Sequence, residues 1–280
     1  MRQNIFFMSG FPRAGTTLLM NVLAQNPRFY TTPTSGLVTS VIHVRDNWRE
    51  NENYMSSDES YIYPKIKTMI KGMMDGFYQE ALNNNRIPID KNRFWTNQVD
   101  LLDEIFDTKV KFIFPIRNVI DCLISFEKMV RKSRINNRVA TNKINELTTL
   151  GRAENYLSNE GVLGLPILGL REILYRKEWD RLILVPFNDL LNYPELSLKR
   201  LYHQLELEYY EHDVNNVKQI IIEHDMFHGF APNSLHKIKE GKITPPTSRD
   251  TTIFQEDFID RIENERYKDI AEFISINSAK

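Results

Sequence analysis

A glycine-framed segment near the start of the chain constrains the fold more than any other part of the sequence. The apolar run Ile5-Phe6-Phe7-Met8 precedes a loop between Gly10 and Gly15, and the loop ends in Thr16-Thr17. Apolar residues then recur at helical spacing from Leu18 to Leu23. A strand, a glycine loop and a helix in this order are typical of a phosphate-binding loop, in which backbone N–H groups at the helix N-terminus bind an anion.

The loop lacks one residue of the motif found in ATP- and GTP-binding proteins. The spacing Gly10-x4-Gly15 fits GxxxxGK[ST], but Thr16 takes the place of the lysine that reaches the β- and γ-phosphates. Arg13 supplies a positive charge from inside the loop, and its planar fork suits phosphate or sulfate oxygens. We expect one anion to be bound by Arg13, Ala14, Gly15, Thr16 and Thr17.

Apolar runs alternate with amphipathic helical patterns along the rest of the chain. Further strands are predicted at 86–90, 110–116 and 182–185, and helices at 37–48, 66–81, 99–106, 119–130, 165–177 and 194–205. Residues 31–36 are predicted as a turn, 51–60 as a linker, and 130–159 as a basic flap. The pattern predicts an α/β fold of three layers with a central, mainly parallel sheet, in a single domain spanning 1–280.

Two further basic residues follow predicted strands. Lys91 comes after the strand at 86–90, and Arg117 ends the apolar run VKFIFPI. Because ligands bind at the carboxyl ends of parallel strands, we expect Arg13, Lys91 and Arg117 to converge on one edge of the sheet. Ser125 lies eight residues after Arg117, a little over two helical turns, so both residues can face one anion.

The composition excludes several classes of partner. The chain of 280 residues has 36 Lys and Arg against 37 Asp and Glu, so it lacks the basic field that attracts nucleic acid or an anionic membrane. The single cysteine, Cys122, cannot form an internal disulfide, and no segment reaches about 18 apolar residues. His224 and His228 have a helical metal-ligand spacing without an obvious third ligand. We therefore expect a cytoplasmic protein that binds no nucleic acid, no membrane and no metal.

The two anion-binding motifs together resemble those of the sulfotransferases that use 3'-phosphoadenosine 5'-phosphosulfate (PAPS). Residues 12–17 look like the arginine-bearing first loop of the tyrosylprotein and bacterial enzymes, and Arg117 with Ser125 resembles the family's 3'-phosphate signature. The resemblance implies a P-loop NTPase-like sulfotransferase fold and transfer of a sulfuryl group from PAPS to a hydroxyl or amine. It also implies that Lys91 offsets charge on the bridging oxygen, and that Phe187 replaces a tyrosine that touches the nucleotide.

The family's proton acceptors are missing from their usual places. Residues 32–35 stand where the tyrosylprotein enzymes have a glutamate, and Arg93 stands where the small-molecule enzymes have a histidine. A hydroxyl that attacks sulfur must still lose a proton. The candidates nearest in sequence are Asp90, His43 and Asp46. Asp90, with Arg13 and Lys91, makes up the predicted catalytic set.

Several alternatives stay open from the sequence. The glycine motif that the cytosolic enzymes carry near the C-terminus is absent, and either the 3'-phosphate or solvent can be the partner of Lys237, Lys239 and Lys242. The acceptor can be a small molecule, a carbohydrate or a peptide, contacted by helical segments at about 31–80 and 130–160. A P-loop kinase acting on a small molecule and a nucleotide-binding protein without catalysis are the alternative functions.

Overall fold

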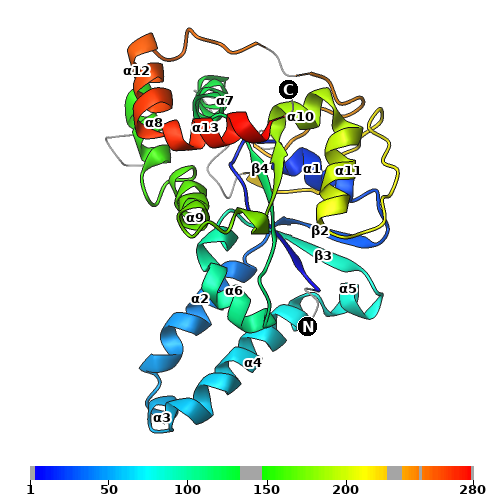
Figure 1. Cartoon of the computed structure of the whole chain (residues 1–280), viewed down its shortest axis with the longest axis vertical. Coiled ribbons are helices and arrows are strands. Elements are labelled where there is room, and N and C mark those ends of the chain that lie inside the picture. Colours follow the sequence, from blue (N-terminus) through cyan, green and yellow to red (C-terminus); the bar gives the residue numbers. More distant parts are fainter. Residues whose placement is uncertain (1–3, 133–146, 226–234, 246–247, 279–280) are drawn as a thin grey trace.

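A five-stranded parallel sheet forms the centre of the computed structural model, which describes residues 4–132, 147–225, 235–245 and 248–278 (Figure 1). The strand order is β2-β3-β1-β4-β5, and every neighbouring pair runs parallel. The strands are β1 (Phe6–Met8), β2 (Phe29–Thr34), β3 (Ile87–Lys91), β4 (Phe112–Ile116) and β5 (Leu182–Pro186). The predicted α/β fold with a parallel sheet is confirmed.

Helices follow most of the strands and supply the outer layers. Those before β4 are α1 (Thr16–Leu23), α2 (Leu37–Asn47), α3 (Glu52–Met55), α4 (Glu59–Phe77), α5 (Gln79–Asn83) and α6 (Val99–Phe106). Those after β4 are α7 (Val119–Lys132), α8 (Thr149–Leu157), α9 (Gly164–Tyr175), α10 (Phe187–Asn192), α11 (Pro194–Gln204), α12 (Glu256–Asp260) and α13 (Lys268–Asn277). Short 3-10 segments include η2 (Trp95–Gln98), and a π-helical segment η6 (Arg261–Arg266) joins α12 to α13. None of the helices in the described part of the chain is long and apolar enough to cross a membrane.

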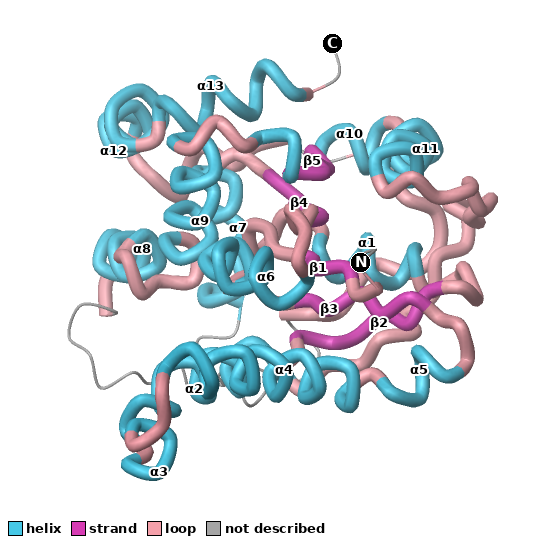
Figure 2. The backbone as a smooth tube through the Cα atoms, turned by 60° about the horizontal axis from the view of Figure 1, so that its bottom comes forward, coloured by secondary structure: helices cyan, strands magenta, loops and turns pink. Residues whose placement is uncertain are grey.

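The alternation of side chains along each strand builds two apolar cores, one on each face of the sheet. In β1, Phe7 belongs to a core shared with α2, α4, α6, α7 and α9, whereas Phe6 and Met8 belong to a core shared with α1 and α11. Figure 2 shows the strands between these groups of helices. The sheet is therefore the middle of three layers, as the sequence predicts.

Three predicted connections differ in the structure. The predicted turn at 31–36 is wrong because β2 extends to Thr34, and Pro33 is tolerated there since β2 is an edge strand paired only with β3. The predicted linker at 51–60 contains α3, and the predicted flap at 130–159 contains α8. Residues 133–146 of that flap lie outside the described residues.

A long segment between α11 and α12, residues 206–255, folds back over α1, and none of the helices and strands named above lies in its described part. We call it the strap. The side-chain oxygen of Asn21 on α1 accepts hydrogen bonds from the amides of Ile220 and Ile221, at 2.6 and 2.8 Å. Gln219 then links two passes of the strap, because its side chain accepts from the Ile238 amide at 2.9 Å and donates to the His236 carbonyl at 3.3 Å. These contacts fix the part of the strap that reaches the carboxyl edge of the sheet.

Candidate active site

A cavity of about 810 Å³ lies at the carboxyl ends of the strands. Its wall combines the first loop, the residues after β3 and β4, one side of α7, the start of α10 and the strap. Arg13, Lys91 and Arg117 all lie on this wall, so the structure brings the three basic residues together. The wall also includes five other predicted site residues: Gly15, Thr16, Thr17, Ser125 and Phe187.

The backbone of the first loop leaves donors open toward the cavity. Gly15 precedes α1 with a φ of 80°, and no side chain caps the helix, so its first amides have no intrahelical partner. Gly10 allows a close approach, because a Cβ there would lie 2.4 Å from the Pro115 carbonyl oxygen. Ala14 is fully buried beneath the loop and contributes backbone only. The loop is thus arranged to bind an anion at a helix N-terminus.

The two predicted anion-binding elements are joined by direct contacts. The Nε of Arg13 donates to Ser125 Oγ at 3.0 Å, and Nη1 of Arg117 donates to the Arg13 carbonyl at 3.0 Å. Arg13 also donates to the Leu235 carbonyl on the strap. Burial, and then the positive charge of Arg117, lower the pKa of Arg13. Two guanidinium groups are therefore held close together on one wall, where an anion would relieve their repulsion.

Phe187 orients Arg117. The Arg117 guanidinium lies 4.2 Å from the centre of the Phe187 ring, a cation–π contact. The same ring limits the first loop, because a Cβ on Gly15 would lie 3.1 Å from it. The Nε of Arg117 is buried and has no hydrogen-bond partner among the described residues. Arg117 thus has an unused hydrogen-bond donor beside the cavity, and a phosphate oxygen is a suitable acceptor for it.

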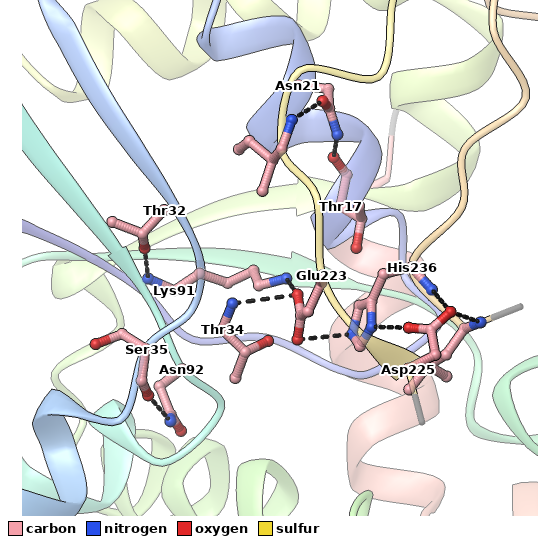
Figure 3. Close-up of polar contacts among 12 residues, drawn as sticks. Thr17, Asn21, Thr32, Thr34, Ser35, Lys91, Asn92, Glu223, Asp225 and His236 are labelled. Carbon is pink, nitrogen blue, oxygen red and sulfur yellow. Dashed lines mark hydrogen bonds and ion pairs between the residues drawn. The ribbon is translucent and has the colours of Figure 1, made fainter. Parts of the chain in front are cut away.

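Lys91 leads to a cluster of charged residues that the sequence does not predict (Figure 3). Its Nζ lies 2.8 Å from Oε2 of Glu223, and both side chains are buried. The same carboxylate oxygen accepts from the Thr34 amide at 3.2 Å. Burial lowers the pKa of Lys91, although Glu223 opposes this effect.

His236 stands between two carboxylates of this cluster. Its Nδ1 is 2.7 Å from Oδ1 of Asp225, and its Nε2 is 3.3 Å from Oε1 of Glu223. Burial and the positive charge of Lys91 lower the pKa of His236 below that of free histidine, so the imidazole is neutral near pH 7. His236 also lies on the cavity wall. A neutral imidazole held by a carboxylate is suited to accept a proton.

The sequence carries only faint signals for this cluster. Asp225 belongs to the segment read as a metal-ligand spacing, yet its carboxylate binds His236, and His228 lies outside the described residues. The described residues contain no group of three or more side chains that could hold a metal ion. His236 directly precedes Lys237, and the sequence pattern there indicates a basic run rather than a site histidine.

The predicted proton acceptors lie away from the cavity wall. Consecutive strand residues point to opposite faces, so Asp90 points away from the face of Lys91. Its two oxygens bond Tyr78 Oη at 2.5 Å and Trp95 Nε1 at 2.7 Å inside the core. Burial raises the pKa of Asp90. The two other candidates, His43 and Asp46, are exposed on α2.

Three lysines of the strap also line the cavity. Lys237, Lys239 and Lys242 are exposed at its rim, and none forms an ion pair with another residue in the described ranges. The whole chain has a formal charge of only −1, and these three lysines add positive charge at the cavity. The cavity therefore concentrates cations locally.

Comparison with known proteins identifies the family of the chain. Residues 6–211 match the family described as "Sulfotransferase family", and none of the curated proteins matches the chain. The structure is similar to the sulfotransferase domain from the curacin biosynthetic pathway, with a TM-score of 0.53, 17% identity and coverage of 97% of both chains. It is also similar to the sulfotransferase domain of the Synechococcus PCC 7002 olefin synthase, with a TM-score of 0.50, 19% identity and coverage of 94% of both chains. Since the family match spans most of the chain, this protein belongs to the sulfotransferase family.

Proposed function

We propose that this protein transfers a sulfuryl group from PAPS to a hydroxyl or amine of an acceptor. The observation that carries the proposal is the contact between two anion-binding elements, the first loop and the Arg117–Ser125 pair, on the wall of one cavity. PAPS has two separate anionic groups, a 5'-phosphosulfate and a 3'-phosphate, and adenosine triphosphate has only one.

The first loop is assigned the 5'-phosphosulfate. Open amides at the start of α1, the hydroxyls of Thr16 and Thr17, and the Arg13 guanidinium all lie on this side of the cavity. Arg13 would exchange its bonds to Ser125 and Leu235 for bonds to the donor's oxygens. A fixed set of donors of this kind stabilises charge that develops in a transition state, so the proposal assigns no role to a metal.

Arg117 and Ser125 are assigned the 3'-phosphate, and the strap lysines add positive charge to the same cavity. Phe187 holds the Arg117 guanidinium in place and would contact the nucleotide through its ring alone, because it lacks the hydroxyl of a tyrosine.

His236 is assigned the role of proton acceptor, in place of Asp90. In the proposed reaction the acceptor oxygen forms a bond to sulfur, and the bond from sulfur to the bridging oxygen of the donor breaks. The acceptor's proton passes to Nε2 of His236, and adenosine 3',5'-bisphosphate leaves with its new charge offset by Lys91. Glu223 and Asp225 then face both N–H groups of the imidazolium.

Calorimetry with adenosine 3',5'-bisphosphate, 5'-AMP and Mg-ATP tests the proposed donor. The bisphosphate should bind most tightly of the three. Arg117→Ala should weaken its binding by about 1.5 to 3 kcal/mol, the range for a charge-assisted hydrogen bond, and should change 5'-AMP binding much less.

Arg261→Ala is a matched control, because Arg261 is exposed and lies outside the cavity. It should bind all three ligands as the unsubstituted protein does. Tighter binding of Mg-ATP than of the bisphosphate would instead favour a kinase. Equal losses for the bisphosphate and 5'-AMP in Arg117→Ala would remove the 3'-phosphate assignment.

A further inference from the structure

Arg93 is a cation on the cavity wall that the proposed reaction does not use. It follows β3, two residues after Lys91, and it is half-buried. Its backbone is fixed, because its carbonyl accepts a hydrogen bond from Ser9 Oγ at 2.9 Å. Ser9 Oγ also contacts Thr96 Oγ1 at 3.0 Å. The position of Arg93 is therefore set by the buried start of the loop and by η2.

The Arg93 guanidinium forms no hydrogen bond and no ion pair with any residue in the described ranges. Three other cations of the wall have partners: Lys91 pairs with Glu223, Lys128 with Asp250, and Arg249 with Asp121. The exposed strap lysines form no ion pair with any residue that the structure describes. None of the Arg93 nitrogens is among the fully buried polar atoms without a partner. The guanidinium therefore keeps access to the open volume of the cavity.

An arginine in this position favours an anionic ligand. Burial lowers the pKa of Arg93 and the Glu223 carboxylate raises it, yet arginine remains charged in proteins. A charge that is partly removed from water and has no directly paired carboxylate is unfavourable, so a bound anion would stabilise it. The planar fork of arginine matches the two oxygens of a carboxylate.

The location of Arg93 separates it from the nucleotide groups. Arg13 is in direct contact with Ser125 and Arg117, whereas the Arg93 guanidinium forms no hydrogen bond with either of these described residues and Arg93 follows Lys91 in the chain. Arg93 thus lies on the side of Lys91 and the proposed proton acceptor. Two residues span at most about 7 Å of extended chain, which places Arg93 within the length of a small molecule from Lys91.

We infer that Arg93 selects the acceptor: the sulfated hydroxyl belongs to a small hydroxy acid whose carboxylate binds the Arg93 guanidinium. This inference rests on the proposed function and names the substrate class of the same site.

Titration calorimetry on protein saturated with adenosine 3',5'-bisphosphate tests the inference. The probes are a panel of hydroxy acids, each compared with its own primary amide, among them 3-hydroxybutanoate and 4-hydroxyphenylacetate. At least one acid should bind about tenfold or more tightly than its amide, as expected of a charge-assisted pair. Arg93→Gln should bring that ratio close to one, and Arg93→Lys should keep part of it because the charge remains without the fork.

The controls separate this inference from the proposed donor. Arg93→Gln should bind the bisphosphate and PAPS as the unsubstituted protein does, and Arg261→Gln should keep the preference for the acid. The inference is overturned if no acid is preferred over its amide, if the preference survives in Arg93→Gln, or if Arg93→Gln weakens binding of either nucleotide. Weak binding of the bisphosphate to the unsubstituted protein would instead count against the proposed function.

Discussion

At the scale of single residues, His236 determines how the proposed reaction depends on protonation. Its imidazole is neutral because burial and Lys91 oppose the charged form, while Asp225 and Glu223 are placed to receive both N–H groups once a proton arrives. The same group can therefore take up a proton during transfer and release it afterwards.

Replacing His236 should slow transfer without preventing nucleotide binding. His236→Gln removes the proton acceptor, so kcat should fall by about 10²- to 10⁴-fold on any acceptor that the unsubstituted protein sulfates. Steady-state assays with labelled PAPS measure kcat, and calorimetry should give an unchanged Kd for adenosine 3',5'-bisphosphate. His43→Gln is the matched control, because His43 is exposed on α2, and it should leave kcat unchanged. A fully active His236→Gln would remove His236 from the mechanism.

The pH profile of kcat/KM gives a second check on His236. Only the neutral imidazole accepts a proton, so kcat/KM should fall as the pH drops through the pKa of His236 and should be level above it. Because that pKa is lowered, the midpoint should lie below pH 6.5. A midpoint above pH 6.5 would contradict the assigned environment.

The residues of the site were predictable where their position relative to a strand determines the place of the side chain. Arg13, Lys91 and Arg117 meet because Lys91 ends a parallel strand and the two arginines follow one. Asp90 also adjoins Lys91 in sequence, but the two-residue period of a strand sends it into the core. His236 escapes prediction because its partners lie 11 and 13 residues away, in a strap with no periodic pattern.

At the scale of elements, Gly15 couples the first loop to the start of α10. Its φ of 80° is strained for other residues, and a Cβ there would come within 3.1 Å of the Phe187 ring. Phe187 in turn holds the Arg117 guanidinium. A side chain at Gly15 would therefore disturb both proposed anion sites.

Two glycine substitutions should have opposite effects on stability. Gly15→Ala should lower the free energy of unfolding by about 1 to 2 kcal/mol and weaken bisphosphate binding. Gly72→Ala, in α4, should raise the free energy of unfolding by about 0.5 to 1 kcal/mol, because a Cβ there meets no atom within 4 Å and alanine favours a helix. Urea titrations and calorimetry measure both quantities. An unchanged stability and Kd in Gly15→Ala would contradict the coupling.

Helices and strands with a clear pattern of apolar residues were predictable, and those that depend on tertiary contacts were not. The apolar run of β4 and the amphipathic pattern of α6 mark their positions within a few residues. β2 contains Thr31, Thr32 and Pro33, a composition shared with turns, and only its pairing with β3 makes it a strand. The strap depends on Asn21, about 200 residues earlier in the chain.

At the scale of the whole molecule, a buried histidine that does not line the cavity links stability to pH. His212 packs in the core beside α1 and α11, and its Nε2 lies 2.9 Å from Tyr202 Oη. Burial lowers the pKa of His212 to about 4. The unfolded chain binds this proton near pH 6.5, so the folded state binds fewer protons between the two values.

Stability should therefore decrease as the pH falls from about 6.5 to about 4, by up to about 3 kcal/mol from this group. Urea titrations across this range should give a steeper pH dependence of the free energy of unfolding for the unsubstituted protein than for His212→Gln. Comparing the slopes cancels any pH-independent decrease in the free energy of unfolding that altered packing causes in the variant. Identical slopes would mean that His212 does not titrate differently on folding.

The central claim about the molecule is that its cavity holds the two anionic ends of one nucleotide at two joined sites. A crystal structure of the complex with adenosine 3',5'-bisphosphate measures this directly. The account predicts the 5'-phosphate within hydrogen-bond distance of the amides at the start of α1, and the 3'-phosphate against Arg117 and Ser125. A nucleotide bound in the reverse direction, or with its 3'-phosphate away from Arg117, would contradict it.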